Sequence, residues 1–302
     1  MLLAGLRNLI PSDLRDRLRP LARRIRLARP QGEWAEAQVS PWRPPTMSEA
    51  TAGAWCLICR WQGDEFIGGF NSELSRCPQC GSIARDRFLL AAWFRRSPKP
   101  STRLRVLETS PRLGDDYRRA MGGWFDYLAS DFDESAHRGS VRLDLQAIDL
   151  PDGSLDVILS AHVVEHTTDP DVVFAEIHRV LAPGGTLYLQ VPVLHASTRR
   201  PSGVEYHGDN TLVHWRFGLD LTDRLRVVGF ETTLLVTQDW LDLVAAGPDA
   251  IAAVPTGDID AIDLLGAPNA ADCVALLDPA TARRYGFLPP WQYFTWECRR
   301  VG

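Results

Sequence analysis

Residues 150–166 read LPDGSLDVILSAHVVEH, and residues 176–192 read EIHRVLAPGGTLYLQVP. Each stretch contains a short apolar run of the length of a buried strand, Leu155–Ala161 in the first and Thr186–Val193 in the second. Between them, Asp171–Leu181 has helical spacing, and Pro170 suits a first helical turn. A strand, a helix and a second strand in this order indicate a crossover between parallel strands.

The same alternation continues on both sides of this unit. Helices are expected at Leu113–Met121 and at about 219–228. Further strands are expected at Leu104–Glu108, Tyr127–Ser130, Val141–Leu145, Glu231–Val236 and Gln292–Cys298. The pattern predicts an α/β fold with a doubly wound, mostly parallel, seven-stranded sheet, helices on both faces and a terminal antiparallel pair of strands.

Four of the six cysteines form two close pairs. Cys56 and Cys59 are separated by two residues, as are Cys77 and Cys80, and 17 residues lie between the pairs. Two such knuckles supply the tetrahedral sulfur shell that zinc prefers, which predicts a zinc ribbon at 54–82. Four thiolates leave no open coordination position, so the Zn²⁺ is expected to be structural. A thioredoxin-type redox pair is the alternative, but it needs only one such pair.

Acidic residues end three of the predicted strands. Residues 103–119, RLRVLETSPRLGDDYRR, give a strand, a tight turn and a helix, and Glu108 ends that strand. Asp131 and Asp144 occupy the corresponding places on the next two strands. In open α/β sheets ligands bind beyond the carboxyl ends of the strands. Asp131 is therefore well placed to bind ribose hydroxyls.

At this point the sequence resembles a known family. An LP, a short turn, an FDVV-type strand, an EH and a helix ending in RVLxPGG are typical of the methyltransferase type 11 branch of class I S-adenosylmethionine-dependent methyltransferases. The resemblance covers about 103–236 and is most specific over 150–193. With the ribbon and the later HGDN…HWRFGLD segment, the chain also resembles zinc-ribbon methyltransferases found beside glycan-assembly enzymes. It implies a Rossmann-like methyltransferase domain at 83–302.

The resemblance also implies roles for particular residues. Glu108 matches the acid of the first cofactor motif, and Asp131 matches the ribose-binding acid. Asp144 and the backbone of Leu145 match the adenine contact, while Ser160 and Ala161 lie where the methionine moiety binds. The family has a glycine-rich turn after the first acid, whereas residues 109–114 are TSPRLG, which places Thr109 and Ser110 beside the cofactor. This departure leaves open a second reading, a scaffold protein that kept the fold and lost the cofactor.

The segment His162–His166 fits HxxEH, which also marks one class of zinc peptidases. Those enzymes need the motif within a sustained helix. Here it follows directly on a strand and is soon followed by Asp169 and Pro170, so at most one helical turn fits. We therefore expect His166 to be a packing and hydrogen-bonding residue near the cofactor.

The polar stretch after Val193 is expected to line the acceptor pocket. Methyl transfer to a hydroxyl needs a base, and the candidates are His195, Glu205, His207, Asp209 and His214, with His207 and His214 leading. Trp215 and Arg216 are expected to shape the pocket or to bind an anionic group such as a diphosphate. The acceptor expected is a glycan, a glycan precursor or another small molecule. An RNA methyltransferase is the alternative, although the ribbon carries only Arg60 and Arg76 for phosphate contact.

The remaining segments complete the domain plan. Residues 1–30 carry eight Arg and two Asp on an amphipathic pattern, so a basic helical arm precedes an acidic remainder, and the whole chain has a net charge of −5. The arm either packs on its own domain or touches an anionic membrane surface. Residues 31–53 read as a linker, and about 240–285 as an insertion. The sequence shows neither an export signal nor an apolar run of membrane-spanning length, which indicates a cytoplasmic protein.

Overall fold

The computed structural model describes residues 53–68, 75–97, 99–133, 141–195, 197–207, 210–247, 249–250, 269–287 and 294–302. The side chains of Leu194, His195 and Val244 are outside this description. The predicted basic arm and nearly all of the predicted linker also lie outside it. No helix in the described part of the chain combines the length and apolar character needed to cross a bilayer.

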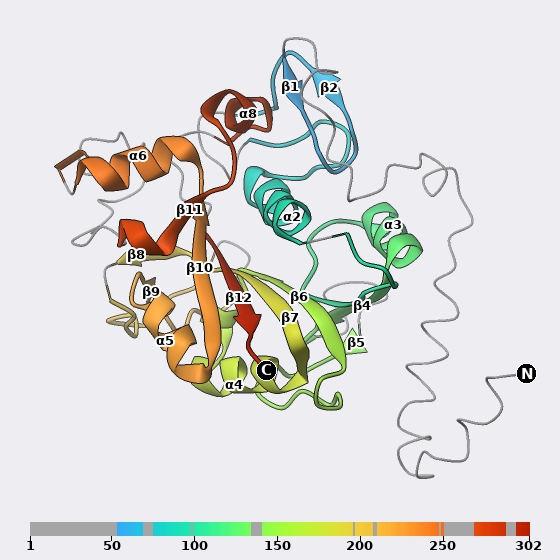
Figure 1. Ribbon diagram of the computed structural model, residues 1–302, viewed down its shortest axis with the longest axis vertical. Helices are drawn as coiled ribbons and strands as arrows, with labels where there is room; N and C mark the ends of the chain where they lie inside the picture. Colours follow the sequence, from blue (N-terminus) through green and yellow to red (C-terminus); the bar gives the residue numbers. More distant parts are fainter. Residues whose placement is uncertain are drawn as a thin grey trace, which may run out of the picture.

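A twisted, mainly parallel sheet forms the centre of the molecule (Figure 1). Its parallel half runs in the order β5 (Val141–Arg142), β4 (Asp126–Asp131), β3 (Arg105–Thr109), β6 (Leu155–Ala161) and β7 (Leu181–Gln190). β12 (Thr295–Arg300) then lies antiparallel between β7 and β10 (Phe230–Val236). From β3 the chain adds β4 and β5 on one side of the sheet and then crosses over to add β6 and β7 on the other.

Helices cover both faces of this sheet (Figure 1). α4 (Pro170–Val180) and α5 (Leu221–Val228) bury Phe174 and Leu225 against one face. α2 (Ala84–Arg96) and α3 (Asp115–Trp124) bury Trp93 and Met121 against the other. The Asp169 carboxylate caps α4 by accepting from the first free backbone N–H groups, and Pro170 begins the helix, as its fixed φ favours.

The predicted α/β fold is confirmed, with one difference in strand count. Within the described ranges the main sheet has eight strands, because the short strand β11 (Cys273–Ala275) pairs parallel with the outer edge of β10. This strand comes from the expected insertion, which also contributes α6 (Gln238–Ala246) and α8 (Pro279–Arg284). Three residues give too short an alternation to be recognised as a strand.

The cysteine-containing segment packs against the domain through α2 and α8. Its hairpin pairs β1 (Ala54–Trp55) with β2 (Gln62–Gly63), and Trp55 meets Tyr285 edge to face at 6.2 Å. The fully buried Arg87 of α2 donates to the carbonyls of Tyr285, Ser82 and Ser75 at 2.8, 2.7 and 3.1 Å. Its guanidinium also lies 3.9 Å from the ring centroid of Phe66. One arginine thus joins the ribbon, α2 and the segment after α8.

Candidate functional site

A cavity of about 580 Å³ opens beyond the carboxyl ends of β3, β4 and β6. Its volume lies within the range of small-molecule sites, and its position is the topological switch point of the sheet. Five of the predicted cofactor residues line it: Thr109, Ser110, Asp131, Asp144 and Leu145. Residues far apart in the sequence therefore meet where the resemblance placed a cofactor.

Asp131 ends β4 and lines this cavity. Its Oδ2 accepts from the Ser110 hydroxyl at 2.8 Å, and its Oδ1 accepts from the backbone N–H of Asp133 at 3.1 Å. The carboxylate is therefore fixed in position before any ligand arrives. Phe132, which follows it, is 65% exposed and also lines the cavity. The sequence analysis missed Phe132, although an aromatic residue directly after a strand-ending acid was a usable signal.

The turn after β3 replaces glycines with side chains that hydrogen-bond. Ser110 has φ +46°, in the left-handed region that glycine adopts more readily. The Thr109 hydroxyl donates to the Ser160 hydroxyl at 3.0 Å. Ser160 is fully buried, and among the described residues it supports the cavity from behind rather than lining it. The non-glycine turn is thus anchored to both neighbouring strands.

Glu108 points into a smaller adjoining cavity between β3 and α2, which Ala161 also lines. Its Oε2 accepts from the Tyr127 hydroxyl at 2.6 Å and from the Tyr117 hydroxyl at 3.0 Å. Burial raises the pKa of Glu108 to about 7, against the partly opposing effect of the two tyrosines. The tyrosines fix this carboxyl, an arrangement that strand spacing alone did not predict.

Asp144 and Leu145 form the opposite end of the main cavity. Asp144 Oδ1 accepts from the backbone N–H of Gln146 at 2.8 Å, which orders the loop after β5. The Gln146 side chain in turn accepts from Thr168 and from the N–H of Asp169. The loops after β5 and β6 are therefore tied together around the cavity.

Histidines form one wall of the cavity. His162, His166 and His214 line it. His207 is not among the lining residues, and its ring centroid lies 4.8 Å from that of His166. The predicted single helical turn is confirmed, since Val164–His166 form the 3-10 helix η4. His162 has φ +56°, and burial together with the nearby Arg85, His207 and His166 holds its pKa well below the usual value.

The other expected acceptor residues have different places. Arg216 forms an ion pair with Glu205 at 2.8 Å, so each charge already has a partner. Trp215 packs under the guanidinium of Arg200 at 4.0 Å and donates to the carbonyl of Thr168. The ion pair gives both side chains a structural contact, and the roles of Arg216 as an anion ligand and of Glu205 as a base stay predictions. Asp209 and the side chain of His195 lie outside the described residues.

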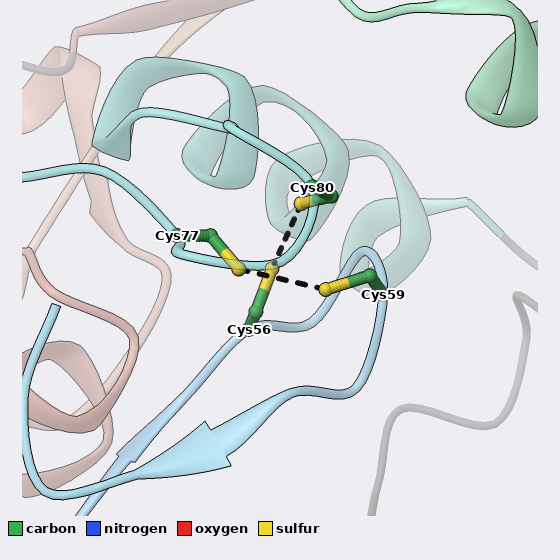
Figure 2. A group of neighbouring side chains, drawn as sticks. All are labelled: Cys56, Cys59, Cys77 and Cys80. Atoms are coloured by element: carbon green, nitrogen blue, oxygen red, sulfur yellow. Dashed lines mark hydrogen bonds between the residues drawn. The ribbon is translucent and has the colours of Figure 1, made fainter. Parts of the chain in front are cut away.

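The four predicted metal ligands converge on one point. Figure 2 shows the sulfurs of Cys56, Cys59, Cys77 and Cys80 directed toward one another. These four sulfurs all lie within 4.8 Å of one another. Two of the Sγ–Sγ distances are 3.6 Å, between Cys56 and Cys80, and 3.5 Å, between Cys59 and Cys77. A tetrahedral zinc with Zn–S bonds of about 2.3 Å requires sulfurs about 3.8 Å apart. The cluster therefore fits zinc with a small expansion.

Both cysteine knuckles turn in the same way. The N–H of Arg60 donates to the carbonyl of Cys56 at 2.8 Å, and the N–H of Gly81 donates to the carbonyl of Cys77 at 3.0 Å. Both residues have a left-handed backbone conformation, with φ +63° for Arg60 and +72° for Gly81. The first knuckle thus uses an arginine where the second uses the glycine that this conformation favours.

Comparison with known proteins finds methyltransferases. A family model described as a methyltransferase domain matches residues 125–189. An arsenite methyltransferase of Aquipseudomonas alcaligenes is 49% identical over 45 residues, 15% of this chain and 13% of that protein. The chain thus spans about an eighth of the length of that curated relative.

Solved structures give low overall scores. An S-adenosylmethionine-dependent methyltransferase from Mesorhizobium loti is 16% identical, with a TM-score of 0.42, over 72% of this chain and 99% of that chain. A Burkholderia thailandensis 1,6-didemethyltoxoflavin-N1-methyltransferase, solved with S-adenosylhomocysteine, is 18% identical, with a TM-score of 0.32, over 43% and 62%. The sheet order and the matched segment together give this chain the Rossmann-like fold of class I methyltransferases.

Proposed function

We propose that this protein transfers a methyl group from S-adenosylmethionine to a hydroxyl of a glycan, a glycan precursor or another small molecule. One observation carries the proposal: Asp131 and Asp144, from neighbouring strand ends, line one cavity at the switch point of the sheet. A carboxylate there suits ribose hydroxyls, and a second acid with adjacent backbone suits an adenine edge. The methyltransferase-domain match over the same strands supports this assignment.

The residues around the cavity suggest how the reaction proceeds. S-adenosylmethionine supplies a methyl group on a positively charged sulfur, and Asp131, Phe132 and Leu145 would hold its adenosine part. His214 faces the cavity and serves as the general base that takes the acceptor's hydroxyl proton. The acceptor oxygen then bonds to the methyl carbon while the carbon–sulfur bond breaks and its electron pair stays on sulfur. His207, the other predicted base, is not among the residues that line the cavity, so His214 is the better placed of the two.

We assign a structural zinc ion to Cys56, Cys59, Cys77 and Cys80. The support is the approach of the four sulfurs and the matching turns of the two knuckles. Four sulfur ligands leave no position for a substrate. Zinc would stabilise a segment whose own hydrophobic core is small, and the ribbon would in turn support α2 beside the cofactor cavity.

Calorimetric titration of S-adenosylmethionine and S-adenosylhomocysteine into zinc-loaded protein tests the cofactor assignment. Asp131→Ala removes an acceptor of charge-assisted hydrogen bonds, each worth about 1.5–3 kcal/mol, so affinity should fall at least about tenfold. Asp149→Ala, an exposed carboxylate outside the described cavity lining, is the matched control and should bind as the wild type does. Folded, zinc-replete protein that binds neither molecule would contradict the catalytic proposal and favour the scaffold alternative.

Acceptor screening follows once cofactor binding is established. Methyl transfer to glycans or their lipid-linked or nucleotide-linked precursors is the expected result. RNA binding that weakens steeply with salt, together with methylation of RNA, would instead favour the RNA methyltransferase alternative.

A further inference from the structure

A second group of metal-ligand side chains lies at the histidine wall of the cavity. Glu165 and His166 come from η4, and His207 comes from the hairpin-like segment that follows β8 (Val193–His195). One ligand atom from each of the three lies within 4.8 Å of the others. This group is separate from the cysteine cluster in both sequence and chemistry.

The carboxylate of Glu165 is held among imidazoles with almost no exposure to solvent. Its side chain is 1% exposed, and its Oε1 lies 3.8 Å from His166 Nε2 and 3.7 Å from His162 Nδ1. Both distances are longer than a hydrogen bond, but they are near the separation of two ligands on one cation.

The tautomer of His166 is set by its other ring nitrogen. Nδ1 lies 2.7 Å from the carbonyl oxygen of Leu212, which can only accept, so Nδ1 carries the proton. The lone pair is therefore on Nε2, which faces Glu165. A histidine that donates from one nitrogen to a carbonyl and offers the other is the usual arrangement at a metal centre.

Backbone hydrogen bonds hold the segment containing His207 against η4. The carbonyl of Glu165 accepts from the N–H groups of His214 and Trp215 at 2.8 and 3.1 Å. Within the segment, the N–H of His207 donates to the carbonyl of Thr211 at 2.9 Å. The three side chains are thus brought together by main-chain contacts rather than by chance surface proximity.

We infer that Glu165, His166 and His207 bind a divalent transition-metal cation such as Zn²⁺. Two nitrogens and one carboxylate oxygen are ligands that such cations accept, and three protein ligands leave one position open. Bond lengths of about 2.0–2.2 Å place tetrahedral ligand atoms about 3.4 Å apart, so the three side chains need to move only slightly inward. Since His166 lines the cavity, we place the open position on that side.

This position also suggests what the cation does, a step that rests on the proposed function. A hydroxyl oxygen of the acceptor bound to the cation has a lowered pKa and is held in a fixed orientation. His214 then takes the proton, and the oxygen attacks the methyl carbon as described above. With one open position the cation binds one acceptor oxygen, so acceptors with a hydroxyl able to reach the cation are the class favoured.

Titration of Co²⁺ into full-length protein with its ribbon already filled by zinc tests the site directly. The expected spectrum has ligand-field bands without the strong sulfur-to-cobalt charge transfer of a thiolate site. Glu165→Gln and His207→Asn should each weaken Co²⁺ binding by at least about 100-fold, since even outer partners of metal ligands are worth about 10- to 100-fold. His178→Asn, a histidine on α4 that packs on Phe230, is the matched control and should titrate as the wild type does.

The outcomes separate this inference from the proposed function. Binding of S-adenosylhomocysteine is measured on the same protein preparations without added cation. Loss of Co²⁺ binding can therefore be told apart from loss of S-adenosylhomocysteine binding. If Glu165→Gln unfolds, His207→Asn gives an independent answer from a less buried position. The site would be overturned if both variants bound Co²⁺ as tightly as the wild type, or if the only Co²⁺ bands were those of a thiolate site. The three side chains would then form an imidazole–carboxylate network without metal.

Discussion

The cysteine cluster and the histidine cluster both gather metal-type ligands, but their surroundings differ. The cysteines belong to a closed sulfur shell that is joined to α2 and α8 through the buried Arg87. The histidines border an open cavity whose lining includes Ser110 and His162, both with positive φ, whereas the described part of the cysteine region has one such non-glycine residue, Arg60. One region is arranged to add stability, whereas the other accepts strain in order to place polar groups.

The largest effect should come from opening the sulfur shell. Cys77→Ser removes one of four ligands from a buried site, so we expect loss of stoichiometric zinc and of more than about 4 kcal/mol of unfolding free energy. Zinc analysis and thermal melting measure both quantities. Cys273→Ser, which alters a buried thiol far from the ribbon in sequence, should keep its zinc. A Cys77→Ser protein that retains zinc and melts normally would show that this region is not a metal-stabilised module.

Arg87 connects the ribbon to the domain, so its replacement should have the next largest effect. Arg87→Met keeps much of the side-chain volume but leaves the carbonyls of Tyr285, Ser82 and Ser75 without this donor, and we expect a loss of about 3–5 kcal/mol. Arg96→Met on the same helix removes only an exposed pair with Glu297 and should cost at most about 1 kcal/mol. Urea unfolding distinguishes them; equal costs would mean that the ribbon is docked by other contacts.

The two regions also differ in how much the sequence predicted. The two CxxC pairs and the acids at the strand ends are recognised from local spacing. The four cysteine ligands and the positions of Asp131 and Asp144 could therefore be predicted from the sequence. The short β11 strand was not, because three residues carry little periodicity. Arg87 and the tyrosine pair on Glu108 depend on contacts between distant segments. The joining of Glu165 and His166 with His207 likewise arises only when the chain after β8 folds back on η4.

A buried carboxyl on the cavity side should give a stabilising substitution. The pKa of Glu108 is raised to about 7 from 4.5, so its neutral form is favoured in the folded state, and wild-type stability falls as pH rises through this interval. Glu108→Gln removes the ionisation, so at pH 8 the variant should be more stable by up to about 3 kcal/mol, and the gain should shrink toward pH 5. Thermal melting across this range measures the difference.

Asp156 supplies the control for that experiment. Its pKa is lowered by the ion pair with Arg105, so it adds stability above its unfolded pKa. Asp156→Asn should therefore destabilise the protein at pH 8, the opposite sign. A pH-independent effect of Glu108→Gln would mean that the two tyrosines already compensate the buried charge.

The smallest effect gives the sharpest comparison, because each region contains a left-handed residue that is not glycine. Arg60→Gly in the first knuckle should stabilise by up to about 1 kcal/mol, since the left-handed conformation costs other residues about 1–2 kcal/mol and part of the relief is lost to chain entropy. Ser110→Gly relieves the same strain but removes the hydroxyl that holds Asp131, so its melting temperature should change little. If strain in the cavity serves ligand placement, Ser110→Gly alone should weaken S-adenosylhomocysteine binding, by about tenfold for one charge-assisted hydrogen bond. Equal behaviour of the two variants in both melting and binding would remove the distinction between a region that is built for stability and one that is strained for function.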